Sequence, residues 1–301
     1  MIRTFKRVFF FPVAYYFAFF AKIALMFWNP AVIVVTGSNG KTGLLNLLES
    51  QIDEVARYSH HANSSIGIPF NILGLKRKTL LFWEWPKLFL LAPLMIFKKK
   101  YKEKIYIVEA DCDRPNEGRF LANLLKPEVV LWINSTRTHS LNFDPLVKNG
   151  KFPSVEEAIA YEFGFFIEKA SKLSLVNGDS KLITKQLDRT HSKVLKVLKK
   201  ELISYEISIS GTRFEIKDKN YVFYCLLPEE FFYSIAFTTE LLSYLNIDSN
   251  NYSNLALPPG RSSLFKGIKG TLLLDSTYNA NLSSMSAILN LFGSIAAKEK
   301  W

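Results

Sequence analysis

A segment that combines glycines with lysine and threonine is the part of the sequence best suited to bind an anion. Residues 32–42 read Val-Ile-Val-Val-Thr-Gly-Ser-Asn-Gly-Lys-Thr. The two glycines let the backbone turn tightly and approach a ligand closely. The lysine supplies a point charge, and the threonine hydroxyl can ligate Mg²⁺. The segment therefore predicts a phosphate-binding loop. Its predicted contact residues are Gly37, Ser38, Asn39, Gly40, Lys41 and Thr42.

The residues on either side of this loop predict the elements that position it. Four apolar residues, Val32–Val35, indicate a short buried strand before the loop. After it, Lys41 begins a predicted helix whose apolar residues include Leu44 and Leu48. The N–H groups at the start of a helix face outward and attract anions. The alternative interpretation is a glycine turn that joins a strand to a helix and binds nothing.

Further strands end in residues that suit a ligand site. Ile105–Glu109 reads as a second buried strand that ends in an acid, and Pro127–Asn134 and Leu173–Val176 read as two more. In a parallel α/β sheet the carboxyl ends of the strands line the ligand crevice. A carboxylate there, opposite a phosphate loop, is well placed to hold Mg²⁺. Glu109 is thus the first predicted metal ligand besides Thr42.

The spacing of the loop resembles that of one known family. Val35 occupies the position of the first glycine in the usual G-x-x-x-x-G-K-[ST] nucleotide loop, so the loop T-G-S-N-G-K-T is shorter. This form resembles the Mur ligases, which use ATP to build cell-wall peptides. Later segments match in order: 59–69, Pro259-Gly260-Arg261 and 275–285, which reads D-S-T-Y-N-A-N-L-S-S-M. The resemblance covers residues 32–289.

The resemblance implies roles for individual residues. Lys41 would act on the transferred phosphoryl group and Arg261 on the nucleotide phosphates. Glu109 and His139 would be metal ligands, with Thr42. Asp275 would contact the ribose, while Tyr278 and Asn279 would lie near the adenine. The predicted substrate-facing residues are Asn63, Ser64 and Ser65.

The resemblance also implies a reaction. ATP and Mg²⁺ would activate a carboxylate as an acyl phosphate, and an amine would then form an amide. The expected substrates are a muramoyl-peptide-like acyl group and a D-amino acid or dipeptide. One departure stands against full activity, because Phe163 takes the place of a lysine that becomes carbamylated in the family. Two alternatives follow: an ATP-binding scaffold without turnover, and an amidating subunit acting on a lipid precursor.

The predicted fold is α/β, with a mostly parallel sheet flanked by helices and a small antiparallel addition. We expect an apolar helix at 1–29, an ATP-binding domain at 30–257 and the beginning of a Rossmann-like domain at 258–301. Residues 76–104 read as an aromatic and basic insertion. Within the ATP-binding domain, residues 202–227 alternate between apolar and polar side chains, which favours antiparallel strands. The predicted later helices are 154–169, 181–200 and 228–245.

Composition narrows the classes of partner. The formal net charge of +11 favours anionic partners such as nucleotides, phosphorylated precursors or an anionic membrane. No basic run with interleaved aromatics resembles a nucleic-acid module, so we expect no nucleic acid. Cys112 and Cys225 are far apart, which predicts neither a disulfide framework nor a zinc site and suits a reducing cytoplasm.

Two apolar segments raise the question of a membrane. Residues 8–28 are apolar except for Lys22, and they follow Arg3, Lys6 and Arg7. Residues 79–97 are apolar and aromatic and lie between two basic clusters. A membrane span, a helix on the inner membrane surface and a helix packed on the protein's own core all remain open for the first segment. For the second, a surface element and a cover for the core remain open.

Overall fold

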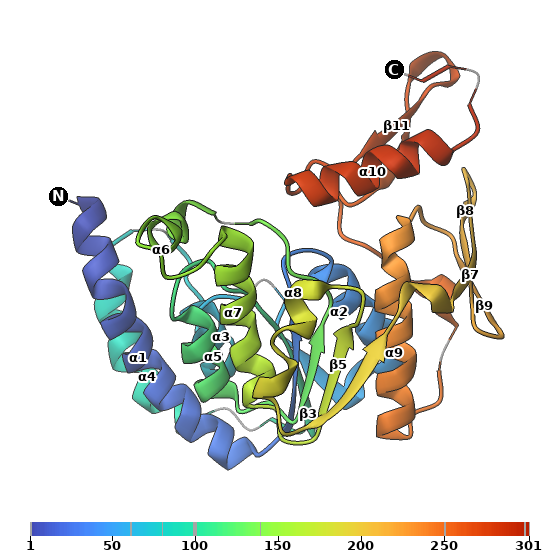
Figure 1. Cartoon of the computed structure of the whole chain (residues 1–301). Coiled ribbons are helices and arrows are strands. Elements are labelled where there is room, and N and C mark those ends of the chain that lie inside the picture. The colour runs from blue at the N-terminus through green and yellow to red at the C-terminus, as the bar shows by residue number, and fades with distance from the viewer. Residues whose placement is uncertain are drawn as a thin grey trace.

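The computed structural model describes residues 2–60, 62–79, 81–98, 101–138, 140–249, 251–297 and 299–300, with side chains in the first helix from residue 9 onward. The predicted metal ligand His139 lies outside the described residues. Figure 1 shows one large α/β body, with the last residues forming a smaller unit beyond it.

The large body is built on a six-stranded parallel sheet with strand order β2-β3-β1-β4-β5-β6. The predicted α/β fold with a mostly parallel sheet is therefore confirmed. Because β1 lies in the middle of the sheet, the loop that follows it opens at the centre of the carboxyl edge. The strands are β1 (Ala31–Thr36), β2 (Ala56–Tyr58), β3 (Ile105–Ala110), β4 (Val129–Trp132), β5 (Leu173–Asn177) and β6 (Lys193–Val197).

Helices cover both faces of the sheet, which explains why its strands are continuously apolar. Side chains of β1 alternate between the two sides: Val34 packs into one hydrophobic cluster and Ile33 into the other. The first cluster includes residues of α1 (Ile2–Trp28), α3 (Gly67–Leu73), α4 (Glu84–Lys98), α5 (Glu117–Leu125) and α7 (Val155–Glu168). The second includes residues of α2 (Lys41–Ile52) and α9 (Phe232–Leu245). Two short helices are α6 (Asp144–Lys148) and α8 (Lys181–Thr184).

An antiparallel sheet joins the second cluster, as the alternation over residues 202–227 predicts. Its order is β7-β8-β9, with bounds Leu202–Ser208, Gly211–Ile216 and Lys219–Phe223. Phe214 and Phe223 are buried there beside residues of α9. The smaller unit contains the hairpin of β10 (Ser263–Lys266) and β11 (Leu272–Asp275), followed by α10 (Leu282–Ser294).

The predicted helix at 181–200 is wrong. Only Lys181–Thr184 is α-helical there, and Lys193–Val197 forms the edge strand β6. The basic residues of this segment suggested a charged helix face. The five residues Lys-Val-Leu-Lys-Val instead favour a strand, because they include two β-branched valines and can pair with β5. Helices α7 and α9 do form within the other two predicted ranges.

A buried carboxylate fixes the start of α5 against α7. Glu162 of α7 accepts hydrogen bonds from the backbone N–H of Asn116 (2.8 Å) and of Gly118 (3.0 Å). Burial raises the pKa of this carboxyl above its usual value, although the backbone donors oppose that shift. The negative charge also lies at the helix N-terminus, where it is favourable.

We predict that Glu162→Ala destabilises the protein, because it leaves two backbone N–H donors at the start of α5 without their acceptor, of which that of Gly118 is buried. The free energy of unfolding should fall by about 1–3 kcal/mol for the buried donor of Gly118, and by a smaller amount for the partly exposed donor of Asn116. Urea denaturation would measure it. The matched control is Glu156→Ala on the same helix, which removes only a half-exposed ion pair with Arg137 and should change stability by less than about 1 kcal/mol. Equal effects of both variants would contradict the capping role.

Candidate functional site

The loop after β1 turns on two glycines, as expected. Gly37 has φ +134° and Gly40 has φ +80°, backbone conformations that other residues rarely adopt. At Gly37 space is limited as well, since an added Cβ would lie 2.8 Å from the carbonyl oxygen of Asn134. Gly40 is the N-cap residue of α2 and provides no side-chain cap. The first turn of α2 therefore remains available to an anion from outside.

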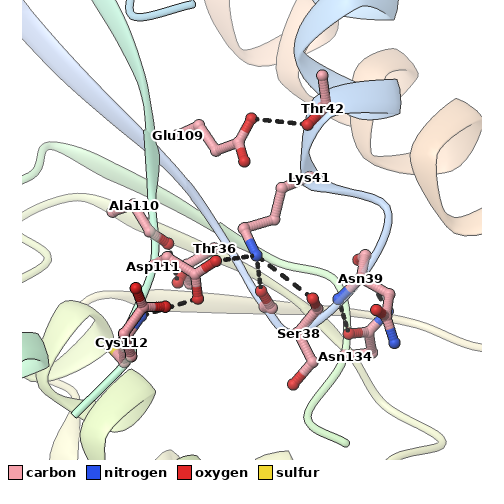
Figure 2. A network of polar contacts seen from close by, with 12 residues as sticks. Thr36, Ser38, Asn39, Lys41, Thr42, Glu109, Ala110, Asp111, Cys112 and Asn134 are labelled. Atoms are coloured by element: carbon pink, nitrogen blue, oxygen red, sulfur yellow. Dashed lines mark hydrogen bonds and ion pairs between the residues drawn. The ribbon is translucent and has the colours of Figure 1, made fainter. Parts of the chain in front are cut away.

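The loop after β4 holds this turn in place. The backbone N–H of Asn39 donates to Oδ1 of Asn134 (2.9 Å), and Nδ2 of Asn134 donates back to the carbonyl of Asn39 (3.0 Å). Beside them, the hydroxyl of Ser38 donates to the carbonyl of Thr136 (2.8 Å) and accepts from its N–H (2.9 Å). Figure 2 shows Asn39 and Asn134 facing each other. Side chains from two adjacent strands thus set the path of the loop.

Lys41 points back under the loop and is fully paired. Its Nζ donates to the carbonyl of Gly37 at 2.6 Å and lies 2.8 Å from a carboxylate oxygen of Asp111 (Figure 2). Burial alone lowers the pKa of Lys41, but the negative charges of Asp111 and Glu109 outweigh it and leave the pKa above its usual value. Lys41 is therefore a buried, permanently charged cation beneath the loop.

Thr42, Glu109 and Arg261 meet on the other side of Lys41. The hydroxyl of Thr42 donates to Oε2 of Glu109 at 3.0 Å and accepts from Nη2 of Arg261 at 3.1 Å. The guanidinium of Arg261 also lies over the ring of Tyr278, 4.1 Å from its centroid. Its Nε is buried and has no hydrogen-bond partner within the described part of the chain. An anion placed here would satisfy that donor.

These residues line a cavity of about 360 Å³. One wall is the face of α2 that carries Thr42, Asn46 and Glu49, which lie one turn apart. The remaining lining residues are His60, Ala62, Asn63, Glu109, Pro258, Arg261 and Tyr278. A cavity of this size, with a cation, two carboxylates and an aromatic ring, suits a polar ligand with an anionic group and a planar group.

The other predicted site residues have different surroundings. Ser64 accepts a hydrogen bond from the N–H of Gly67 at the start of α3, and Ser65 is buried with its hydroxyl on Glu117 at 2.7 Å. Oδ1 of Asp275 accepts from Thr277, and Asn279 is exposed. None of the four lines the cavity, whereas Asn63, Arg261 and Tyr278 do. The sequence-based roles of all these residues stay predictions.

Asp111 is the residue whose role the sequence did not reveal. It forms the ion pair with Lys41, a contact that the motifs of the sequence do not indicate. A signal was present, since side chains two residues apart along an extended segment point to the same side and Glu109 already lay on that side. Asn46 and Glu49 could likewise have been found from their spacing to Thr42.

Phe163 does not face solvent. Its side chain is fully buried in the first cluster, and its ring lies 6.2 Å from the ring of Trp132 at the carboxyl end of β4. The neighbouring Glu162 binds backbone groups at the start of α5. In this chain, the residue at position 163 therefore contributes to core packing beside the glycine loop.

The smaller C-terminal unit touches the loop directly. The side-chain amides of Asn39 and Asn281 exchange hydrogen bonds, and Asn281 is also the N-cap of α10. Asn39 thereby connects two segments 242 positions apart in the sequence. The orientation of the unit depends in part on this pair of amides.

We predict that Asn39→Ala loosens the C-terminal unit while leaving its own helix cap intact. Loss of about 1 kcal/mol of hydrogen bonding should increase the rate of proteolytic cleavage between residues 258 and 272 about fivefold. Limited trypsin digestion followed by mass spectrometry would measure it. The control Asn290→Ala alters an exposed asparagine of α10 and should leave the rate unchanged. An unchanged cleavage rate in Asn39→Ala would show that the contact between Asn39 and Asn281 does not stabilise the C-terminal unit.

Comparison with known proteins gives a consistent result. A UDP-N-acetylmuramoyl-tripeptide–D-alanyl-D-alanine ligase of Buchnera aphidicola subsp. Baizongia pistaciae (strain Bp) is 22% identical over 284 residues, which cover 89% of this chain and 55% of the relative. Among solved structures, MurF of Acinetobacter baumannii superimposes with a TM-score of 0.71 at 14% identity, covering 91% of this chain and 56% of that one. MurF of Thermotoga maritima, solved with ADP, gives a TM-score of 0.69 at 19% identity, covering 93% and 61%.

A more distant structure has the same fold. It is a bifunctional folylpolyglutamate synthase/dihydrofolate synthase with Mn, AMPPNP and L-glutamate bound, with a TM-score of 0.53 at 16% identity, covering 90% of this chain and 69% of that one. The comparison with models of protein families found no match. The chain spans little more than half the length of its MurF-type relatives. At these identities the structural likenesses establish the fold.

Proposed function

The chain has the fold of the Mur ligases and resembles MurF in sequence, and from this premise we propose that it is an ATP-dependent ligase that joins a carboxylate to an amine. The observation that carries the proposal is the meeting of Thr42, Glu109 and Arg261 on one cavity beside the glycine loop. Three segments far apart in the sequence supply, at one place, a helix N-terminus, a carboxylate and a cation. That combination suits a nucleotide polyphosphate with its counter-ion.

The chain's own residues would act mainly through charge and position. A carboxylate oxygen of the acyl substrate attacks the γ-phosphorus of ATP, and ADP leaves with the electrons of the broken P–O bond. The amine then attacks the carbonyl carbon of the acyl phosphate, phosphate leaves with the electrons of the broken C–O bond, and the nitrogen gives up one proton, so that the products are an amide, ADP and phosphate. Lys41 and Arg261 neutralise oxygens that gain charge during the transfer. For this, Lys41 exchanges its bond to Asp111 for one to phosphate.

A divalent cation fits this site. The hydroxyl of Thr42 and the carboxylate of Glu109 are oxygen donors 3.0 Å apart that line the cavity. Within the described ranges, no group of three or more histidine, cysteine or acidic residues could hold a metal alone. Thr42 and Glu109 would therefore hold Mg²⁺ together with phosphate oxygens and water, the arrangement Mg²⁺ prefers. Bound there, Mg²⁺ would offset phosphate charge. His139 remains a sequence-based candidate for a further ligand.

The substrates follow from the resemblance. We propose a muramoyl-peptide-like acyl group and a D-amino acid or dipeptide as the amine, with Asn63 on the cavity wall facing the acyl substrate. Tyr278, stacked under Arg261, would lie beside the nucleotide base, with Asp275 and Asn279 toward the ribose and adenine. The proposed organisation keeps residues 30–257 as the ATP-binding domain and 258–301 as part of a C-terminal domain. The proposed location is the cytoplasm, which also agrees with the two widely separated cysteines.

A second candidate function is supported by Phe163. A phenyl ring cannot be carbamylated or ligate a metal, and burial in the core leaves it no contact with a ligand. The alternative is a protein that binds nucleotide without turnover and acts as a scaffold. The two candidates differ in whether phosphate is released.

We predict that Lys41→Met weakens ATP binding about 10- to 100-fold, because it removes a charge-assisted contact to phosphate while keeping the apolar stem. Isothermal titration calorimetry with ATP and Mg²⁺ would measure the affinity. The control is Lys185→Met, which alters a surface lysine paired with Glu157 and should bind ATP like the parent.

Phosphate release then separates the candidates. Release by the parent that requires both a muramoyl-peptide acceptor and D-alanyl-D-alanine supports the ligase. Tight ATP binding without release supports the scaffold. Failure of the parent to bind ATP, or equal binding by parent and Lys41→Met, would overturn both.

A second prediction concerns Asp111. Its carboxylate competes with phosphate for Lys41, so Asp111→Asn should increase the affinity for ADP and ATP about 3- to 10-fold by removing a buried negative charge near the phosphates. The same titration would measure it. Asp113→Asn makes the same change two residues further along the loop and serves as the control. A weaker affinity in Asp111→Asn would mean that Asp111 assists nucleotide binding instead.

A further inference from the structure

Helix α4 is apolar on two opposite faces. Its inner face carries Leu88 and Ala92, which are buried in the first hydrophobic cluster. The outer face carries Leu90 and Phe97, which are 73% and 78% exposed, and Trp83, which immediately precedes the helix, is 83% exposed. A helix that only covers the core of a soluble protein has a polar outer face. This one leaves large apolar side chains in water.

Helix α1 has the same property. Its buried residues, such as Ala14 and Phe17, lie on one side. Tyr15, Phe19 and Met26 recur at spacings of four and seven residues and are 60%, 60% and 72% exposed. This spacing places them along one outer face of the helix.

The two helices lie side by side at the end of the molecule away from α9 (Figure 1). The hydroxyl of Tyr16 in α1 donates to the backbone carbonyl of Phe89 in α4 at 2.8 Å, and their rings are 4.8 Å apart. We call the exposed residues at this end the outer aromatic surface. It comprises Tyr15, Phe19 and Met26 of α1, with Trp83, Leu90 and Phe97 at α4.

The two segments that carry this surface are rich in basic residues and poor in acids. Residues 1–28 contain four basic residues and no acid, and residues 76–98 contain five basic residues and one acid, Glu84. The carboxylate of Glu84 accepts hydrogen bonds from the N–H groups of Lys78 (2.6 Å) and Thr79 (3.1 Å), so it holds the preceding segment against the start of α4. Among the described side chains, Lys22, Lys87 and Lys98 are exposed on the two helices. The charge around the apolar side chains is therefore strongly positive.

We propose that the outer aromatic surface binds the surface of an anionic lipid bilayer, with α1 and α4 lying along the membrane. Apolar and aromatic side chains flanked by lysines and arginines are what an interfacial helix needs: the rings enter the headgroup boundary, and the basic residues attract anionic headgroups. Two adjacent helices with such faces bind as one unit. This inference does not depend on the proposed ligase activity.

The packing favours a helix that lies on the membrane over one that crosses it. By length and composition, Phe9–Trp28 is the one helix in the described parts of the chain that could span a bilayer. Its inner face, however, is built into the core through Ala14, Phe17 and Ala21, each 0% exposed. Crossing the membrane would remove these side chains from the core and uncover the residues they pack against.

A second copy of the chain is a less suitable partner for the outer aromatic surface than an anionic bilayer. Pairing two outer aromatic surfaces would bring two sets of basic residues together, and within residues 1–28 and 76–98 only Glu84 of each copy could offset this repulsion. An anionic bilayer instead matches both the apolar residues and the charge.

The test is co-sedimentation of the purified chain with sucrose-loaded vesicles. We expect binding to vesicles of phosphatidylcholine mixed with phosphatidylglycerol, much weaker binding to pure phosphatidylcholine, and weakening by salt. Trp83→Ser combined with Phe97→Ser should reduce the partition coefficient at least about tenfold. The matched control, Tyr224→Ser with Ile203→Ser, removes two exposed apolar side chains, one just after β9 and one in β7, and should bind normally.

Charge reversal provides an independent variant pair. Lys87→Glu with Lys98→Glu should weaken binding to the anionic vesicles at least about 25-fold, at about fivefold or more for each altered basic residue. Lys193→Glu with Lys219→Glu changes the net charge equally at exposed strand positions and should weaken it far less. Far-UV circular dichroism would verify that every variant is folded.

Three outcomes would overturn the proposal. The first is equal binding by the surface variants and their controls. The second is a dimer in sedimentation velocity that Trp83→Ser with Phe97→Ser dissociates, since the surface would then be an interface between copies. The third is membrane association that resists alkaline carbonate extraction, which would identify a span.

Discussion

The side-chain amide of Asn134 holds the backbone of the glycine loop, and the rest of the site depends on that constraint. It accepts from the N–H of Asn39 and donates to the carbonyl of the same residue, so the turn cannot open without breaking both bonds. The sheet makes this contact available, because β1 and β4 are adjacent and parallel and end at the same edge. A helix N-terminus, a buried cation and a carboxylate are thus fixed relative to one another before any ligand arrives.

The charges of the site are balanced within the protein. Lys41 and Asp111 neutralise each other in the interior, where an isolated charge would be costly. Glu109 is held by the Thr42 hydroxyl, and Arg261 is stacked on Tyr278 with one buried N–H that has no partner among the described residues. The most incomplete hydrogen bonding of the site is therefore on a cation that faces the cavity. This arrangement is suited to an anionic ligand.

Much of the fold could be predicted from the sequence, because apolar runs and glycine positions report local structure directly. β1, β3, β4 and the glycine loop were found from such runs, and the predicted helix at 154–169 agrees with α7, whose N-cap is Ser154. The edge strand β6 was missed, because its pairing with β5 is a tertiary contact and its lysines resemble a helix surface. β2, with three residues, is too short to give a pattern.

The site was predictable in its parts but not in its connections. Glu109 and Arg261 were identified from position and motif, whereas the pairing of Lys41 with Asp111 depends on how two loops pack. The contact of Asn39 with Asn281 spans most of the chain, and no local signal could reveal it. The double apolar character of α4 was visible as composition, but only the fold shows which face is left uncovered.

The amide pair between Asn39 and Asn281 has a thermodynamic consequence. A ligand that reshapes the glycine loop must also alter the hydrogen bonds that Asn39 makes to α10, so the energy of the loop and the orientation of the C-terminal unit are linked. Linkage of this kind is reciprocal. A partner that binds to or displaces residues 258–301 therefore changes the affinity of the loop for its ligand, and the ligand changes the affinity of these residues for that partner by the same factor. The side chain of Asn39 couples the two parts of the molecule.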